Sequence, residues 1–318
     1  MNFDDVEKAR VAYHTKYSKL QKRALIIYAV LFGAALMMVI TMVSPDFSSI
    51  MSNLGGNLIF GGVFLFAGLF VPSVFYAIIA LIIIGHKTNK EKIAYERAYR
   101  AYFVERVLAA TFTDLYHRHD EGLSKEKLRS TLMIDTGDRY RSNDYTRGKY
   151  KNVAFEQADV HIQEEHKDSD GDTTYVTTFR GRFMIFEFPK KFQSRLLVAG
   201  SGARVARVSM GAEFRALETE SNEFNRRFRI LAEDGFEMFY LLDPAMMTRM
   251  EVVADAYNNR VMFGFCDNRV IVGINDGKDA LEPPSASKSL DEKTEMEKNL
   301  KDVKVITDLV DTLRLSRG

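Results

Sequence analysis

The stretch HKDSDGDTTY, residues 166–175, has the residue types of a calcium loop, with aspartates at positions 168, 170 and 172. An EF-hand loop begins in this way, and it continues with glycine at its sixth position and a bidentate glutamate at its twelfth. Counted from Asp168, those two positions hold Thr173 and Phe179. Both flanking segments also have the pattern of strands rather than helices. We therefore interpret the stretch as the solvated tip of a β-hairpin, where aspartate and glycine suit the turn.

A wider segment rich in acids and histidine, residues 159–172, is the best material for an enzyme. It holds Asp159, Glu164, Glu165 and His166, which could assist a metal if they converged in a partly buried pocket. Side chains at a loop tip are usually solvated instead. We therefore favour a protein that is not an enzyme, assign no catalytic, cofactor-binding or metal-binding residue, and expect no cofactor. A metal-assisted enzyme around 159–172 is kept as the alternative.

Another pair of metal-ligand types, His117 and His119, lies in YHRHDE, residues 116–121. A metal site needs ligands that converge on one point. Histidines two residues apart point in different directions on a helix, which is the structure expected for this segment. The pair therefore adds no metal site to the interpretation.

The composition excludes some classes of function. The chain has 318 residues, with 44 Lys and Arg against 43 Asp and Glu. This balance gives no sign of a nucleic-acid partner. The lone cysteine, Cys266, rules out an internal disulfide and lies in the apolar run VMFGFCDNR. We expect it to be a buried, unreactive side chain.

Two uncharged runs, residues 24–43 and 57–85, dominate the N-terminal third. Each is long enough to cross a bilayer as a helix, because a crossing needs about 20 apolar residues. Lysines and an arginine flank the pair on its outer sides, whereas the connector 44–56 has neither. The positive-inside rule then places both termini in the cytoplasm. We expect a two-helix transmembrane hairpin that acts as an anchor, since neither run has an ionisable residue of the kind that transport requires.

The remaining chain predicts an α+β domain. Aromatic residues at helical spacing favour a helix over 87–119, and residues 135–148 are polar and rich in turn formers. Strand patterns follow, with hairpin turns predicted at 234–235 and 267–268. Gly181 interrupts one strand, which indicates a bulge or a close backbone approach. Asp243 before a proline predicts the start of a helix.

The fold class expected is α+β, with the transmembrane hairpin followed by a cytoplasmic domain of mainly antiparallel strands with helices packed on it. The organisation has five parts: an N-terminal segment (1–23), the hairpin (24–85), a juxtamembrane helical region (86–137), the α+β domain (138–282), and a linker with a C-terminal amphipathic helix (283–318).

The C-terminal helix, expected over 290–315, has apolar residues at spacings of three and four from Met296 to Leu313. Such a stripe can dock on its own domain or pair with another helix. Its short length favours docking, because isolated short coiled coils are marginally stable.

Four segments give the chain a resemblance to a bacterial family of membrane-anchored domains of unknown function, numbered three-one-three-seven. They are NDYTRGKYKNVAFEQADV (143–160), FRGRFMIFEFPKKF (179–192), LETESNEFNRRFRILAEDGFEMFYLLDPAMMTRMEVV (217–253) and VMFGFCDNRVIVGI (261–274). The resemblance implies a protein of the bacterial cytoplasmic (inner) membrane with a cytoplasmic α+β domain, and it implies no activity.

The function expected is therefore that of a membrane-anchored cytoplasmic binding or scaffold module that acts through protein–protein contacts at the inner face of the membrane. The partners expected are the lipid bilayer, a membrane or cytoplasmic protein and a second copy of the chain, with no nucleic acid.

Overall fold

The computed structural model describes residues 1–42, 58–167, 171–203 and 214–317. The chain forms two compact units. The first comprises residues 1–102 and 283–291, and the second comprises residues 103–282 and 292–318. We call them the helical unit and the sheet unit and describe each by itself.

The helical unit is built on two long helices, α1 (Phe3–Met42) and α3 (Leu58–Tyr99). They pack side by side, with the Tyr76 hydroxyl donating to the Ala24 carbonyl at 3.0 Å and Lys16 paired with Glu91 at 2.6 Å. Residues 283–291 belong to the same unit, because Arg10 donates to the Ala286 carbonyl at 2.5 Å. The described residues of the two uncharged runs lie in α1 and α3, so they are helical.

The predicted transmembrane hairpin is wrong on this structure. Within the residues described, none of the helices is sufficiently long and apolar to span a bilayer. The spans 24–43 and 57–85, and with them the multi-pass inner-membrane localisation with both termini in the cytoplasm, are corrected accordingly.

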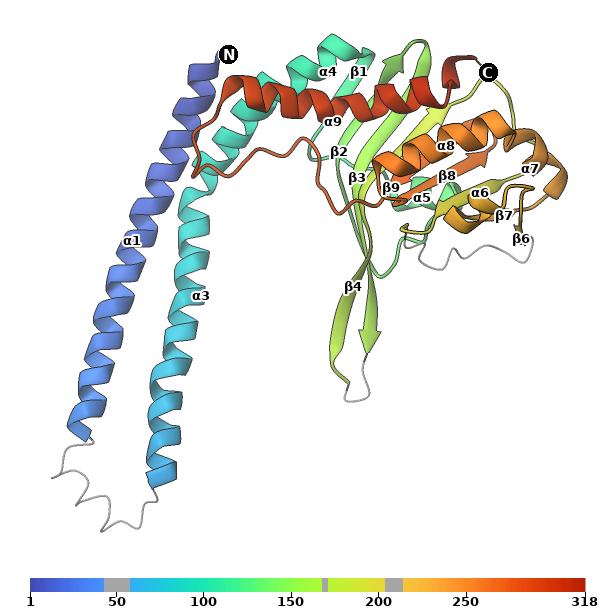
Figure 1. Ribbon diagram of the computed structural model, residues 1–318. Coiled ribbons are helices and arrows are strands. Elements are labelled where there is room, and N and C mark those ends of the chain that lie inside the picture. The colour runs from blue at the N-terminus through green and yellow to red at the C-terminus, as the bar shows by residue number, and fades with distance from the viewer. Residues whose placement is uncertain (43–57, 168–170, 204–213, 318) are drawn as a thin grey trace. The chain divides into compact units, whose positions relative to one another are not determined.

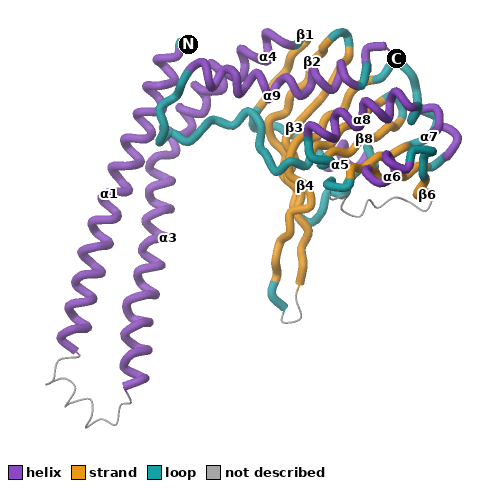
Figure 2. The backbone as a smooth tube through the Cα atoms, in the orientation of Figure 1, coloured by secondary structure: helices purple, strands orange, loops and turns teal. Residues whose placement is uncertain are grey.

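Among the residues described, the sheet unit forms a nine-stranded sheet in the order β1-β2-β3-β4-β9-β8-β5-β7-β6, and the paired strands are antiparallel. Figure 2 shows these strands with the helices around them. The strands are β1 (Thr113–Arg118), β2 (Arg139–Tyr150), β3 (Val153–Lys167), β4 (Thr173–Glu187), β5 (Leu196–Gly200), β6 (Arg215–Leu217), β7 (Phe228–Ala232), β8 (Val261–Cys266) and β9 (Arg269–Ile274).

The helices that follow the helical unit are mostly short, with the exceptions of α8 and α9. They are α4 (Glu105–Thr111), α5 (Lys125–Ser130), α6 (Asn222–Arg227), α7 (Gly235–Leu241), α8 (Pro244–Ala256) and α9 (Glu292–Thr312). A π-helical turn, Arg100–Val104, precedes α4, and a 3-10 turn, Leu315–Arg317, ends the chain.

Both faces of the sheet are covered by packed side chains. Successive side chains on one strand point to opposite faces, as β4 shows. On β4, Phe183 is fully buried in a core cluster that includes Leu128 of α5. The preceding Arg182 points to the other face, as alternation requires, and its guanidinium contacts Asp302 of α9 at 3.1 Å. The helix α9 runs across this second face (Figure 1), and Ile306 and Val310 are fully buried there. The C-terminal helix therefore docks on its own unit.

Gly181 lies where two strands approach closely. It pairs with Val160 of β3, and its φ of 150° lies in a region that side chains disfavour. A Cβ at this position would collide with the carbonyl oxygen of Ile274. The close backbone approach predicted for Gly181 is confirmed.

Local signals of the sequence have mixed outcomes. The turn at 267–268 and the cap by Asp243 are confirmed, the latter by a 2.6 Å bond from the Met246 amide. The helix predicted over 87–119 ends at Thr111, after which residues 113–118 form β1. The polar residues 139–150 form β2 rather than a loop, because both of its neighbours in the sheet pair with it.

The hairpin predicted at 234–235 is wrong. Asp234 instead caps helix α7, with its carboxylate accepting from the Phe236 amide at 2.9 Å. An Asp-Gly pair suits a tight turn and a helix N-terminus equally well. The hairpin predicted at 166–175 is confirmed by the pairing of Lys167 with Thr173, while residues 168–170 lie outside the part of the chain described.

Candidate functional site

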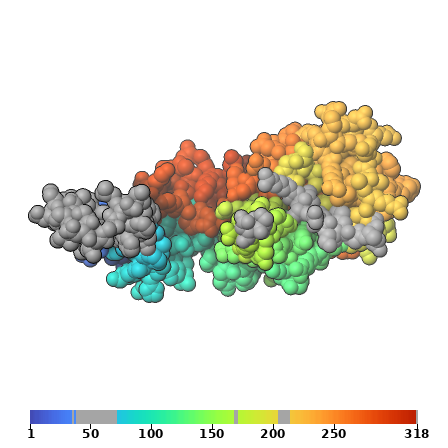
Figure 3. Space-filling model, turned by 90° about the horizontal axis from the view of Figure 1, so that it is seen from below, coloured from blue at the N-terminus to red at the C-terminus, as the bar shows by residue number. Residues whose placement is uncertain are grey.

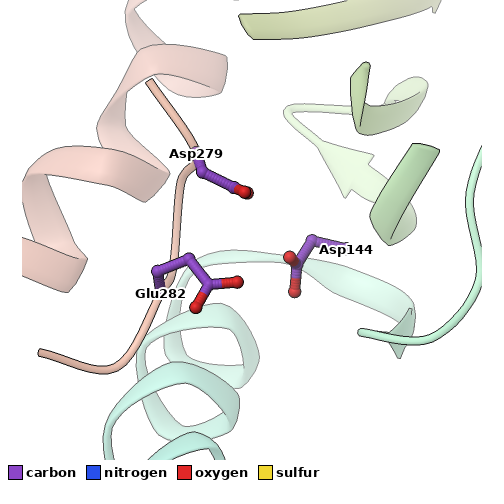
Figure 4. A group of neighbouring side chains, drawn as sticks. All are labelled: Asp144, Asp279 and Glu282. Atoms are coloured by element: carbon purple, nitrogen blue, oxygen red, sulfur yellow. The ribbon is translucent and has the colours of Figure 1, made fainter. Parts of the chain in front are cut away.

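Three carboxylates form what we call the acidic cluster: Asp144, Asp279 and Glu282 (Figure 4). One oxygen atom from each lies within 4.8 Å of the others. Asp144 lies where the β2–β3 register shifts, with a left-handed φ of 54° that aspartate tolerates better than most residues. The other two come from the segment after β9. The cluster therefore joins residues 135 positions apart in sequence (279 − 144).

Backbone and amide contacts hold the cluster in place. The Asp144 amide donates to the carbonyl of His119 at 3.1 Å. The Asn143 side-chain amide donates to Asp144 at 2.6 Å and to Asp279 at 3.3 Å, so it bridges two of the carboxylates. Asp144 is 2% exposed, whereas Asp279 lies at the surface. The cluster thus extends from the interior of the sheet unit to solvent.

Asp159 anchors the same segment from β3. Its carboxyl group accepts from the Ala280 amide at 2.6 Å and is almost fully buried. Burial raises the pKa of Asp159 to about 9, with a further contribution from the negative charge of Asp144, and the nearby Arg182 only partly opposes this. Asp159 is therefore protonated at neutral pH, and its hydrogen bond with Asp279 adds a second link to the segment.

Oxygen ligands of this kind suit hard cations such as Mg²⁺ or Ca²⁺. The same contacts also give the cluster a structural role, since they fasten residues 279–282 to β2 and β3. Further along, the Leu281 amide donates to Asp302 at 3.4 Å and Lys298 donates to the Glu282 carbonyl at 2.7 Å. The cluster is thus part of the polar contact between the sheet and α9.

The residues of the predicted enzyme segment 159–172 are distributed along the β3–β4 ribbon. Asp159 alone reaches the acidic cluster among the described members of that segment. Glu165 accepts from the Tyr175 hydroxyl at 3.0 Å, and His161 contacts Thr177 at 3.0 Å, both across the ribbon. Asp168 and Asp170 lie outside the described residues. Among the described residues of the segment, these contacts do not converge on one point.

His117 lies near the end of strand β1, in place of the helix expected for this segment, and the two histidines near residue 118 contact different side chains. The Nδ1 atom of His117 contacts the Thr146 hydroxyl at 2.9 Å on the neighbouring strand, and His119 lies 4.0 Å from Asp120. Each ring therefore has its own neighbour.

A groove of about 610 Å³ lies over β2, β3 and the turn between β8 and β9. In its wall the Tyr145 hydroxyl donates to Glu156 at 2.8 Å, and Lys127 pairs with the same carboxylate. Burial and this hydrogen bond raise the pKa of Tyr145 to about 12, so the phenol remains a donor at neutral pH. The cations Lys149 and Arg269 also line the groove but are paired with acids. The groove has the size of a small-molecule site, although Lys127, Lys149 and Arg269 in its lining are each paired with an acid.

An aromatic face on α7 is the feature that sequence reasoning missed. Phe236, Phe239 and Tyr240 are 70%, 59% and 72% exposed, and their spacing of three and four residues places them on one side of the helix. We call this set the aromatic face. The segment around α7 lies at the surface of the sheet unit (Figure 3). The sequence GFEMFYL contains this spacing. The predicted hairpin at 234–235 makes the segment a strand, in which the three residues would not share a face.

The fold and these features define an α+β protein with an antiparallel sheet, a docked C-terminal helix and an exposed aromatic face. Residues 177–315 match the model of the family described as "Protein of unknown function (DUF3137)". This match confirms the resemblance to that family over those residues. Comparison with curated proteins gives no match.

One solved structure is similar to part of the chain. It is the crystal structure of the mycobacterial trehalose monomycolate transport factor A, TtfA. The likeness covers 63% of this chain and 88% of that chain, at 10% identity and a TM-score of 0.34. Similarity at this level carries no functional conclusion.

Proposed function

We propose that the protein is a binding or scaffold module that acts through protein–protein contacts. The aromatic face of α7 is the observation that carries this proposal. Aromatic side chains are enriched at the centres of protein interfaces and dominate their energetics. The largest apolar patch on a monomeric soluble protein, roughly 300–600 Å², is often functional, and here three exposed aromatic side chains share one helix face.

The helical unit adds a second apolar surface in support. Aliphatic side chains on α1 and α3 are at least half exposed: Leu25, Ile26, Val30, Leu31, Ile79, Leu81 and Ile82. Exposed apolar area on this scale gains free energy when it is covered. A module with an exposed apolar surface on each of its two units is suited to act as a scaffold that binds other molecules.

The alternative of a metal-assisted enzyme around 159–172 has less support. Only Asp159 of the described residues in that segment meets the acidic cluster, where it fastens the Ala280 amide. A catalytic site needs several such groups at one point.

Position-specific photocrosslinking in cells tests the proposal. Benzoylphenylalanine replaces Phe236 in the full chain, and the matched control carries the same group at the exposed Glu220 of the sheet unit. The proposal expects a protein adduct of discrete mass from position 236, reduced at least fivefold by Tyr240→Ser in the same chain, and none of that mass from position 220. Adducts to lipid alone, or equal protein adducts from both positions, would overturn it.

A further inference from the structure

The aromatic face is held outward by the rest of α7. On the opposite side Met238 is 1% exposed, so it fixes one side of the helix in the core. The Glu237 carboxylate accepts the amides of Gln193, at 2.6 Å, and of Ser194. Asp234 caps the first turn. Turning the aromatic residues inward would break all of these contacts, so their exposure is built into the fold.

The aromatic face is also partly preformed. The rings of Phe236 and Tyr240 lie 5.2 Å apart with their planes at 63°, an edge-to-face arrangement that is favourable between aromatic rings. Rigid aromatic side chains lose little conformational entropy on binding. The three positions present hydrocarbon, and the Tyr240 hydroxyl supplies a polar group. The occupant that suits this surface is itself apolar and aromatic.

The exposed area decides how strong such a contact can be. An aromatic side chain buries roughly 150–250 Å² when it is fully covered. With exposures of 59–72%, the three side chains together offer about 400 Å². Two such faces would bury about 800 Å², which is below the 1,200–2,000 Å² or so of stable interfaces and within the range of weak, transient contacts. The area therefore fits a weak, concentration-dependent pair.

We propose that the aromatic face pairs with the same face of a second copy of this chain, in a weak dimer about a twofold axis. In such an isologous contact each patch meets its own equivalent. A face of aromatic hydrocarbon is complementary to itself, since it needs no matching charge or shaped pocket on a different protein. This inference rests on the proposed function, because it names the partner of the same surface.

Site-specific crosslinking tests the pairing in the full chain. Cys266→Ala first removes the only native thiol. Phe236→Cys in that background places one thiol on the face, and Glu220→Cys supplies the matched exposed control. A short bis-maleimide is then added at several protein concentrations. We expect a covalent dimer from position 236 that grows with concentration, at least tenfold less with Phe239→Ser in the same chain, and no comparable dimer from position 220.

The outcomes separate the two proposals. Equal dimer from both cysteine positions, or dimer that Phe239→Ser leaves unchanged, would overturn the pairing, because association would then use another surface such as the helical unit. No dimer from position 236, together with a protein adduct at that position in cells, would reject the second copy and retain the binding module. Absence of both would reject both. Sedimentation velocity of wild type against Phe239→Ser gives a second measure, with a weaker concentration dependence expected for the variant.

Discussion

Replacing Asp159 by asparagine should stabilise the sheet unit, and the gain should depend on pH in a defined way. The carboxyl group is 5% exposed, and burial raises its pKa to about 9 in the folded chain. In the unfolded chain an aspartate has a pKa of about 3.9. Between these values the folded chain keeps the proton and the unfolded chain does not. Folding therefore takes up a proton in that window.

The sign and size of the change in the free energy of unfolding follow from the linkage between folding and protonation of Asp159. A raised folded-state pKa gives stability that is fully present below about pH 4 and is lost as pH rises toward 9. Each pH unit in the window costs about 1.4 kcal/mol. At pH 7 the loss is on the order of 4 kcal/mol, from about three pH units above the unfolded value. Asparagine is neutral throughout and has nearly the same shape, so it can still accept from the Ala280 amide and donate to Asp279.

Urea denaturation of wild type and Asp159→Asn, followed by circular dichroism at pH 4, 5, 6, 7 and 8, measures the difference in free energy of unfolding. We expect near equality at pH 4 and a difference that grows by about 1.4 kcal/mol per pH unit in favour of the variant. Every other titrating group is common to both proteins, so the slope reports Asp159. Glu220→Gln, which removes an exposed charge, is the control and should give a flat difference.

A difference that stays constant with pH would refute the reasoning, because Asp159 would then be ionised in both states. A variant that is destabilised at every pH would show instead that the amide cannot replace the carboxyl group in its contacts with Ala280 and Asp279.

Three further predictions concern stability. Gly181→Ala should destabilise by at least about 2 kcal/mol, because its φ of 150° and the carbonyl of Ile274 leave no room for a Cβ; an unchanged melting temperature would contradict this. Ile306→Ala should cost about 2–5 kcal/mol in urea denaturation, since the side chain is fully buried, whereas Leu300→Ala, 43% exposed on the same helix, should cost much less. Asp243→Ala should cost about 1 kcal/mol by loss of the α8 cap, and Asp243→Asn should restore most of it.

A local structure was predictable from the sequence where residues close together in the chain specify it by themselves. Asp243 followed by Pro244 starts a helix because the capping carboxylate and the amide that it accepts, that of Met246, are three residues apart. The turn at Asp267 joins strands that follow each other directly. The apolar stripe of the last helix, residues 292–312, likewise has its period within one segment. At these three places the residues that specify the structure lie within one segment, so the sequence predicts it correctly.

The tertiary structure decided the features that depend on distant partners. Asp234-Gly235 is compatible with a hairpin and with a helix start, and the burial of Met238 together with the amides that Glu237 binds selects the helix and turns its aromatic residues outward. Residues 139–150 are polar, yet they form a strand because β1 and β3 flank them.

The sequence by itself determined the α+β class, the Asp243 cap, the turn at 267–268 and the helical period of α9, because each depends on the spacing of residues that are close together in the chain. Only the tertiary structure brought Asp144 next to Asp279, protonated Asp159 by burying it, and replaced the predicted transmembrane hairpin by the helical unit. Residues 135 positions apart come together, and a carboxyl group loses its solvent, only when the whole unit packs. No single segment of the sequence specifies that packing.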